Sequence, residues 1–228
     1  QPEMIRSEVA WLRALRHDSD IVAPDPVPAK DGSFVQTLGA PELDQPRCAV
    51  MMTFLTGEEP DPDGLLEGFD RLGEIAARMH RHAKSWARPA DFIRPTWAVR
   101  AILDDEYKWG WWREGYDMDE PAQALLERAG ETILARLAKL EPDAERFGLS
   151  HFDLRLSNTL IEGEATKVID FDDSGFSWYL YDIAPALTLL EDRPDVDELV
   201  ATWLAGYRRV AEVPRDMEAD FLALYEKA

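Results

Sequence analysis

The chain has 228 residues, and its 46% apolar side chains are enough for a folded core, which excludes a disordered chain and a disulfide-stapled miniprotein. Acidic residues outnumber basic residues by 45 to 25, and the net charge of −20 argues against a nucleic-acid partner and a polybasic membrane anchor. The longest apolar stretch, residues 48–55, is too short to span a bilayer, and the lone Cys48 excludes a disulfide framework. We therefore expect a cytoplasmic protein; its oligomeric state is not set by the sequence.

The first third of the chain predicts one helix followed by a β-hairpin. Apolar residues recur every three to four positions between residues 5 and 15, which is the spacing of a helix face. The proline-rich residues 24–28 end that helix. Residues 33–38 and 47–55 are β-like runs joined by a loop with glycine and prolines, so we expect an antiparallel hairpin with one strand well buried.

The rest of the chain predicts mainly helices around a second, shorter hairpin. A Gly- and Pro-containing acidic stretch, residues 57–64, marks a lobe boundary, so we divide the chain into residues 1–57 and 58–228. The expected elements are helices over 65–86, 125–140, 178–191, 195–210 and 214–226, and strands over 158–161 and 166–170. The fold class is therefore α+β.

Polar side chains gather at the two ends of the second hairpin. Asn158 begins its first strand and Asp170 ends its second, so the hairpin brings the two side chains together. An amide oxygen and a carboxylate at one place form a hard-oxygen site, which suits Mg²⁺ completed by water and phosphate. Asp153, in the preceding polar loop, can lie beside such a metal and accept the proton of an attacking hydroxyl. This set of groups meets the needs of phosphoryl transfer.

Other interpretations of these acids remain open at this point. Each of these acidic residues, taken alone, is also consistent with a residue that caps a strand or faces solvent. A metal phosphohydrolase that uses Asp153, Asp170 and Asp172 would carry the same residues. In a phosphoryl-transfer site Asp172 is a candidate for a second metal, while Asp173 fits a turn or cap.

The motifs resemble those of the aminoglycoside phosphotransferase and choline kinase family, relatives of the protein kinases. The matching residues are His151-Phe152-Asp153, then Asn158, and later Ile169-Asp170-Phe171-Asp172. The resemblance implies a protein-kinase-like two-lobe fold and transfer of the γ-phosphoryl group of ATP to a small-molecule hydroxyl, with ATP and Mg²⁺ as cofactors. It also implies that Asp153 is the catalytic base, that Asn158 and Asp170 are metal ligands, and that His151 supports the loop.

The resemblance extends over most of the chain. Residues 7–15 are similar to the family's small-lobe helix, with Glu8 in the place of the glutamate that pairs with the phosphate-binding lysine. Residues 51–57 resemble the hinge strand, whose backbone holds adenine, and this implies a binding role for Met52, Thr53 and Phe54. Residues 77–80 resemble the family's A-x-L-H helix, and Asp182 resembles the aspartate that braces the catalytic loop. Residues 175–182 are more similar to the homoserine-kinase-like branch than to the antibiotic-resistance branch.

Two departures from the family pattern change the expectations. The Gly-rich loop and the strand lysine are absent, so we expect a small lobe truncated to a hairpin plus a helix. The chain begins with Gln1, which favours a missing front, and the alternative is a pseudokinase or binding module that has lost catalysis. Arg155 replaces the usual histidine two residues after the base. It is a candidate for a catalytic cation facing the γ-phosphate, and equally a solvated loop arginine.

Residues 104–112 interleave acids with aromatic side chains. Such a surface can hold an amino-bearing acceptor through cation–π contacts and charge, and the alternative is that its tryptophans pack the lobe. A protein-kinase role, with a protein in place of the small-molecule acceptor, is a nearer alternative than a pseudokinase or a phosphohydrolase. The acceptor itself is not named by the sequence, since loops that differ between relatives shape this pocket.

Overall fold

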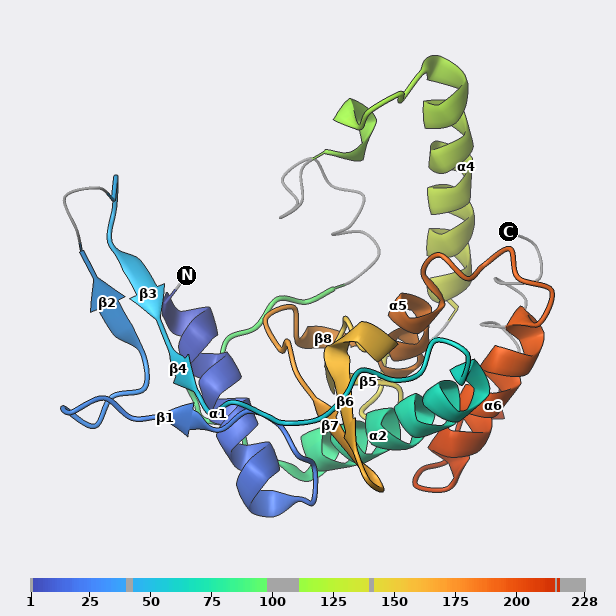
Figure 1. Ribbon diagram of the computed structural model, residues 1–228. Coiled ribbons are helices and arrows are strands. Elements are labelled where there is room, and N and C mark those ends of the chain that lie inside the picture. The colour runs from blue at the N-terminus through green and yellow to red at the C-terminus, as the bar shows by residue number, and fades with distance from the viewer. Residues whose placement is uncertain (1, 40–42, 98–110, 140–141, 216, 218–228) are drawn as a thin grey trace.

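The computed structural model describes residues 2–39, 43–97, 111–139, 142–215 and 217. These residues form the expected α+β fold, with short strands and one helix on the N-terminal side and mainly helices on the C-terminal side (Figure 1). The linker 57–64 separates the two parts, and the division into residues 1–57 and 58–228 stays a prediction. Within the described ranges, no helix combines the length and the apolar character that crossing a membrane requires.

The N-terminal part begins with α1 and continues in two pairs of antiparallel strands. The elements are α1 (Pro2–Asp18), β1 (Pro26–Val27), β2 (Gln36–Leu38), β3 (Arg47–Ala49) and β4 (Met51–Met52). Strand β2 pairs with β3 and strand β1 pairs with β4. The predicted helix and hairpin are therefore confirmed, although the strands are shorter than the apolar runs.

The prediction that one strand of this hairpin is well buried is wrong. In β3, Arg47 is exposed and Cys48 is only half-buried. Farther along, Met51 is 68% exposed and Phe54 is 91% exposed. A two-stranded ribbon can cover one face at most, so an apolar run within it does not imply burial on both sides.

The large-lobe core is built on two helices that cross with their backbones in close contact. Helix α2 (Leu65–Ser85) packs on α6 (Val196–Arg208), and the apolar stripe predicted for α2 is confirmed as buried. The contact depends on two glycines: a Cβ on Gly73 would lie 1.9 Å from the carbonyl oxygen of Trp203, and one on Gly206 would lie 2.1 Å from that of Asp70.

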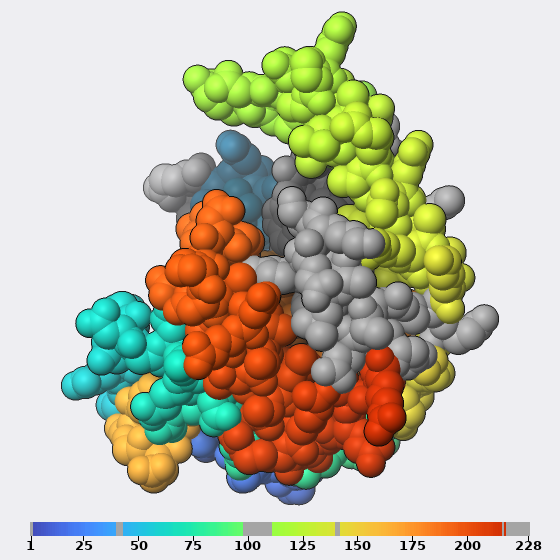
Figure 2. Space-filling model, turned by 90° about the vertical axis from the view of Figure 1, so that its right-hand side faces the viewer, coloured from blue at the N-terminus to red at the C-terminus, as the bar shows by residue number. Residues whose placement is uncertain are grey.

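Helix α4 (Glu120–Leu137) confirms the helix predicted from the second apolar stripe, but not its burial. Asp119 caps the helix by accepting a hydrogen bond of 2.9 Å from the N–H of Ala122. Leu125 and Leu126 are 58% and 41% exposed, and Gly130 is the only buried residue of the helix in the described structure. Helix α4 and the 3₁₀ turn η1 (Trp112–Glu114) project from the body of the large lobe (Figures 1 and 2).

Four short strands carry the loops of the candidate site. Strand β6 (Thr159–Glu162) pairs with β7 (Ala165–Val168), which confirms the second predicted hairpin, and β5 (Phe147–Ser150) pairs with β8 (Gly175–Trp178), which the sequence did not predict. The helix expected over 178–191 is instead the end of β8, a 3₁₀ turn η3 (Tyr179–Asp182) and a short α5 (Ile183–Leu187). The last predicted helix, 214–226, lies almost wholly outside the described residues.

Candidate active site

The hairpin β6–β7 brings the predicted metal ligands to one place. Asn158 ends the 3₁₀ turn η2 (Leu156–Asn158) just before β6. The N–H of Ile169 donates to the carbonyl oxygen of Asn158 at 3.0 Å, so Asp170 follows directly beside Asn158. Asp170 is exposed and has a left-handed backbone with φ of 65°, which turns the chain sharply out of the strand. The two residues are thus neighbours at the end of the hairpin, as expected, and their role as metal ligands stays a prediction.

Asn158 is bonded directly to the predicted base. Its side-chain Nδ2 donates to the carbonyl oxygen of Asp153 at 2.9 Å and to the carboxylate Oδ2 of Asp153 at 2.8 Å. Both donors of the buried amide are thus used on Asp153, and its oxygen is left as an acceptor that can coordinate a cation. Arg155 lies on the same carboxylate, with Nε 3.4 Å from Oδ2. The guanidinium and the carboxylate therefore form an ion pair beside Asn158.

Asp182 braces the loop that carries the base. Its Oδ1 accepts the N–H of Phe152 at 2.8 Å and its Oδ2 accepts the N–H of His151 at 3.3 Å. Its Oδ2 also lies 2.9 Å from Nε2 of His80, whose other ring nitrogen lies 3.0 Å from the hydroxyl of Tyr207. Burial raises the pKa of Tyr207, so its hydroxyl stays protonated and donates to the His80 ring. The bracing role expected for Asp182 is confirmed in this geometry.

His151 connects the catalytic loop to the end of β7. Its Nε2 lies 3.0 Å from the carbonyl oxygen of Ile169, and its Nδ1 accepts the N–H of Asp153 at 3.3 Å. Burial lowers the pKa of His151, which favours the neutral ring with its proton on Nε2. A neutral ring satisfies both contacts, so His151 supports the loop, as expected, and holds Asp153 close to the residue before Asp170.

An aromatic stack that sequence reasoning missed fixes the residue between His151 and Asp153. Phe152 has φ of 70°, an unusual backbone for a bulky residue. Its ring lies between Trp97, with centroids 4.8 Å apart, and Tyr181, at 4.4 Å, and both neighbours are stacked. The aromatic richness of the region around Trp97 was the available signal, but spacing along the chain does not show which rings meet.

Two further predicted site residues, Asp172 and Glu8, both contact Arg94. Asp172 is exposed on the loop after β7, and its carbonyl oxygen accepts a hydrogen bond from Arg94. Glu8 on α1 lies 3.6 Å from the same arginine. The resemblance implies that Glu8 pairs with a lysine. Among the described residues, Glu8 instead forms an ion pair with Arg94.

At the predicted hinge, part of the backbone is already engaged. The N–H of Thr53 donates to the carbonyl oxygen of Asp25 at 2.9 Å, and the hydroxyl of Thr53 accepts the N–H of Asp25 at 2.9 Å. The N–H of Thr53 is therefore used within the chain, and the role expected for Thr53 in holding adenine stays a prediction. Met52, paired with Pro26 in β4, and the exposed Phe54 remain the candidates at this strand.

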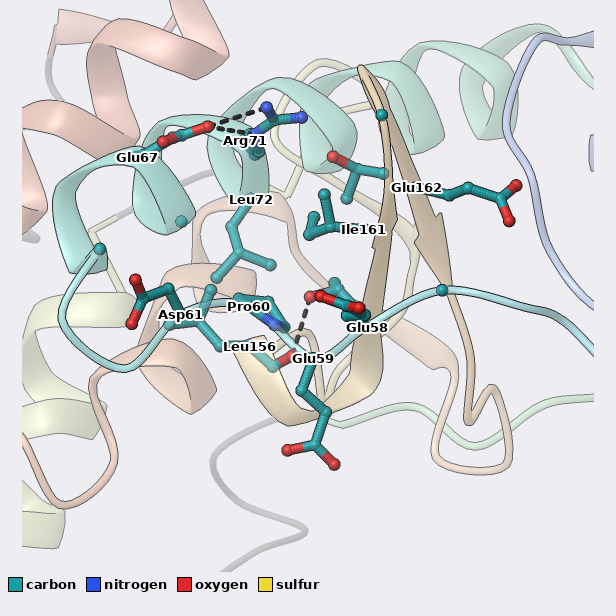
Figure 3. Close-up of a pocket in the computed structure, with 16 residues that line it drawn as sticks. Glu58, Glu59, Pro60, Asp61, Glu67, Arg71, Leu72, Leu156, Ile161 and Glu162 are labelled. Atoms are coloured by element: carbon teal, nitrogen blue, oxygen red, sulfur yellow. Dashed lines mark hydrogen bonds and ion pairs between the residues drawn. The ribbon is translucent and has the colours of Figure 1, made fainter.

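A cavity whose lining does not include Asp153, Asn158 or Asp170 lies beside the hairpin. It has a volume of about 930 Å³ and lies between the 57–64 linker, the start of α2 and the hairpin β6–β7 (Figure 3). Its lining carries Glu58, Glu59, Asp61, Glu67 and Glu162. Its one arginine, Arg71, is already bonded to Glu67 at 2.8 Å. An acidic lining repels phosphates, so this cavity is not the expected nucleotide site.

Metal binding at the hairpin requires few protein groups. Within the described ranges no three His, Cys, Asp or Glu side chains gather in a metal-binding arrangement. The free amide oxygen of Asn158 and the exposed carboxylate of Asp170 nevertheless fit Mg²⁺, which usually keeps several waters and is held by one or two carboxylates plus phosphate oxygens.

The fold and this set of residues define a kinase-like phosphotransferase that acts on small molecules. The model of the phosphotransferase enzyme family matches residues 1–219, and the chain belongs to that family. Among solved structures, a microcompartment-associated aminopropanol kinase is 38% identical, with a TM-score of 0.86 over 99% of this chain and 71% of that chain. The comparison with curated proteins found no match.

More distant solved structures share the fold. An amicoumacin kinase in complex with AMP-PNP, Ca²⁺ and Ami is 21% identical, with a TM-score of 0.78 over 98% of this chain and 68% of that chain. A choline/ethanolamine kinase family protein from Mesorhizobium loti is 14% identical, with a TM-score of 0.60 over 98% of this chain and 65% of that chain. The recognised family and the kinase-like fold class are therefore confirmed.

Proposed function

We propose that the protein transfers the γ-phosphoryl group of ATP to the hydroxyl of a small amino alcohol. The observation that carries the proposal is the amide of Asn158, bonded to the carboxylate of Asp153 and adjacent to Asp170. A proton acceptor and two hard-oxygen ligands thus share one hairpin end. Membership of the phosphotransferase enzyme family supports the reaction class.

Each residue of the site has one role in this proposal. Asp153 accepts the proton of the acceptor's hydroxyl group. The hydroxyl oxygen bonds to the γ-phosphorus, and the bond between that phosphorus and the bridging oxygen of ADP breaks. Asn158 and Asp170 would hold Mg²⁺, with Asp172 as a candidate for a second ion; bound Mg²⁺ neutralises phosphate charge. Arg155, 3.4 Å from the Asp153 carboxylate, adds positive charge near the phosphoryl group. Glu8 stays a proposed contributor to nucleotide binding.

An amino-bearing acceptor fits both the chemistry of the site and the comparison. The carboxylates of Asp153, Asp172 and Asp173 favour a cationic substrate over an anionic one. The 38% identical relative is named as an aminopropanol kinase, which supports a short amino alcohol here. Most of the segment 104–112 lies outside the described residues. The Arg113 guanidinium lies 4.2 Å from the ring centroid of Trp112, so that ring already has a cation from the chain itself.

The experiment that tests the base is Asp153→Asn in the intact protein. We expect kcat for ATP-dependent phosphorylation of the acceptor to fall by about 10²- to 10⁴-fold, because the amide cannot accept the proton. Initial rates with purified enzyme and a panel of amino alcohols measure the effect. Exposed Asp63→Asn is the matched control and should leave kcat unchanged.

The rival functions give different results in the same assay. A phosphohydrolase releases phosphate from ATP without an acceptor, and a pseudokinase consumes no ATP. A protein kinase labels a protein substrate and ignores amino alcohols. Undiminished transfer by Asp153→Asn would contradict the assigned base. The cytoplasmic location expected from the lone cysteine stays a prediction.

A further inference from the structure

A buried arginine that the sequence analysis did not single out lies beneath the loop that follows Asp170. Arg94 belongs to residues 92–97, a segment that runs beside β8. The N–H of Phe176 donates to the carbonyl oxygen of Pro95 at 2.8 Å, and the N–H of Trp97 donates to that of Phe176 at 2.8 Å. These bonds fix the segment, and the Arg94 side chain is only 2% exposed.

One side of the guanidinium holds the loop 171–174. Its Nε donates to the carbonyl oxygen of Ser174 at 2.6 Å. Its Nη2 donates to the carbonyl oxygens of Phe171, at 3.3 Å, and Asp172. Three backbone carbonyls of the loop therefore converge on one cation, and they define the path of the chain directly after Asp170.

The other side of the guanidinium holds α1. Its Nη1 donates to the carbonyl oxygen of Met4 at 3.2 Å and lies 3.6 Å from the carboxylate Oε2 of Glu8. Four carbonyls and one carboxylate thus surround a group that has five N–H donors. Four of the N–H donors are hydrogen-bonded to carbonyls and the guanidinium also faces the Glu8 carboxylate, so Arg94 acts on the site through the backbone it holds.

The surroundings of Arg94 compensate for burying its charge. Burial lowers the pKa of Arg94, and the charges of Glu8, Asp172 and Asp173 oppose that change. An arginine stays protonated in proteins, so the guanidinium remains a fixed cation. Removing it would leave the converging carbonyls without their donors, and unsatisfied buried carbonyls favour a different path for the loop.

We propose that Arg94 is a positioning residue that locks the loop 171–174 to α1 and so fixes Asp170 relative to Glu8. Its effect on metal use rests on the proposed function, whereas the link between the loop and α1 can be tested without any activity. The two parts of the proposal therefore need separate measurements.

The first measurement is a double-mutant cycle on the intact protein in urea. We compare Glu8→Gln, Arg94→Met and the double variant by their denaturation midpoints and slopes. If the two side chains are coupled, the loss of stability in the double variant is smaller than the sum of the single losses. Additive losses would overturn the link. Should Arg94→Met not fold, Arg94→Lys takes its place in the cycle, because it keeps a charge but cannot reach all three loop carbonyls.

The second measurement is a Mg²⁺ titration, followed in two ways. Enzyme assays give the Mg²⁺ concentration for half-maximal activity, and calorimetry gives the Mg²⁺ concentration for half-maximal ATP binding. For Arg94→Lys we expect about a tenfold increase in both, since losing a group that orients a metal ligand typically weakens metal affinity by 10- to 100-fold. The acceptor KM should not change. A purely structural role would reduce the amount of active enzyme and leave the half-maximal concentration unchanged, and that result would overturn the positioning role.

The matched control is Arg209→Met. Arg209 binds Asp70 at 2.6 Å and Glu74 at 2.9 Å, and so connects α6 to α2 away from the proposed site. We expect this variant to lose stability without a change in Mg²⁺ requirement. If the unmodified protein shows no Mg²⁺-dependent use of ATP, the proposed function and the positioning role both fail, while the urea cycle still decides whether the link exists.

Discussion

Phe152 shows how a strained residue can hold a reactive one in place. A left-handed backbone at a bulky residue costs about 1–3 kcal/mol and persists only where the surroundings enforce it. Asp182 holds the N–H of Phe152, while Trp97 and Tyr181 hold its ring from both sides. The carboxyl group of Asp153, one residue later, is thereby directed toward Asn158.

Truncating this side chain should be costly. For Phe152→Ala we expect the free energy of unfolding to fall by about 3–5 kcal/mol, because a buried aromatic side chain and both ring contacts are removed. Urea denaturation of the variant and the unmodified protein measures the change. Tyr116→Ala is the control, since Tyr116 is 96% exposed and should change stability by less than about 0.5 kcal/mol. A loss below about 1 kcal/mol at Phe152 would show that the stack does not hold the loop.

The sequence predicted the central residues of the site and two that support the loop, His151 and Asp182, but not Arg94 or Trp97. Asp153, Asn158 and Asp170 follow a fixed spacing around a hairpin, so a motif could locate them. Arg94 and Trp97 bind main-chain carbonyls of a loop some 80 residues away, and any residue type can offer a carbonyl. Such contacts leave no spacing pattern for a sequence reader to find.

At the scale of elements, the contact between α1 and α2 contains a buried histidine. His82 on α2 is 8% exposed, and neither ring nitrogen has a hydrogen-bond partner in the described structure. Its Nε2 lies 3.7 Å from Oδ2 of Asp18 at the end of α1. Burial lowers the pKa of His82, and the charge of Asp18 only partly opposes it. The folded protein therefore prefers the neutral ring.

The buried His82 should make the folded protein less stable as the pH falls. Below the ordinary histidine pKa of about 6.5, the unfolded chain binds a proton at His82 that the folded chain does not, so stability falls as pH falls. The slope for one such group is at most about 1.4 kcal/mol per pH unit. His82→Phe should weaken the fall in unfolding free energy between about pH 7.5 and 5.5, measured by urea denaturation. His151 shifts in the same direction in both proteins, and parallel pH profiles would contradict the prediction.

Helix patterns predicted the elements better than strand patterns did. The stripes of α2 and α4 extend over four or more turns, so their period is visible in the sequence. Strands β5 and β8 are as short as β6 and β7, four residues each, but they are far apart in the sequence and no turn joins them into a visible hairpin. Burial was harder to predict than structure. The α4 stripe and the run 47–55 look like core in sequence, yet several of their apolar side chains are exposed.

At the scale of the molecule, the arrangement of the parts explains where the chemistry lies. Helices α2 and α6 form a rigid base through their glycine contacts, and His80 on α2 and Tyr207 on α6 support Asp182. Asp182 in turn holds the catalytic loop. Arg94 connects the loop 171–174 to α1. The family's motif is thus held from both parts of the chain.

The most direct test of this account is a product analysis with the intact protein, ATP, Mg²⁺ and a panel of short amino alcohols. Phosphorus-31 NMR and mass spectrometry would identify and count the products. We predict one phosphate monoester of the acceptor for each ADP formed, and no ADP when Mg²⁺ is chelated. Inorganic phosphate released without a phosphorylated acceptor, or ATP left intact with every acceptor, would contradict it.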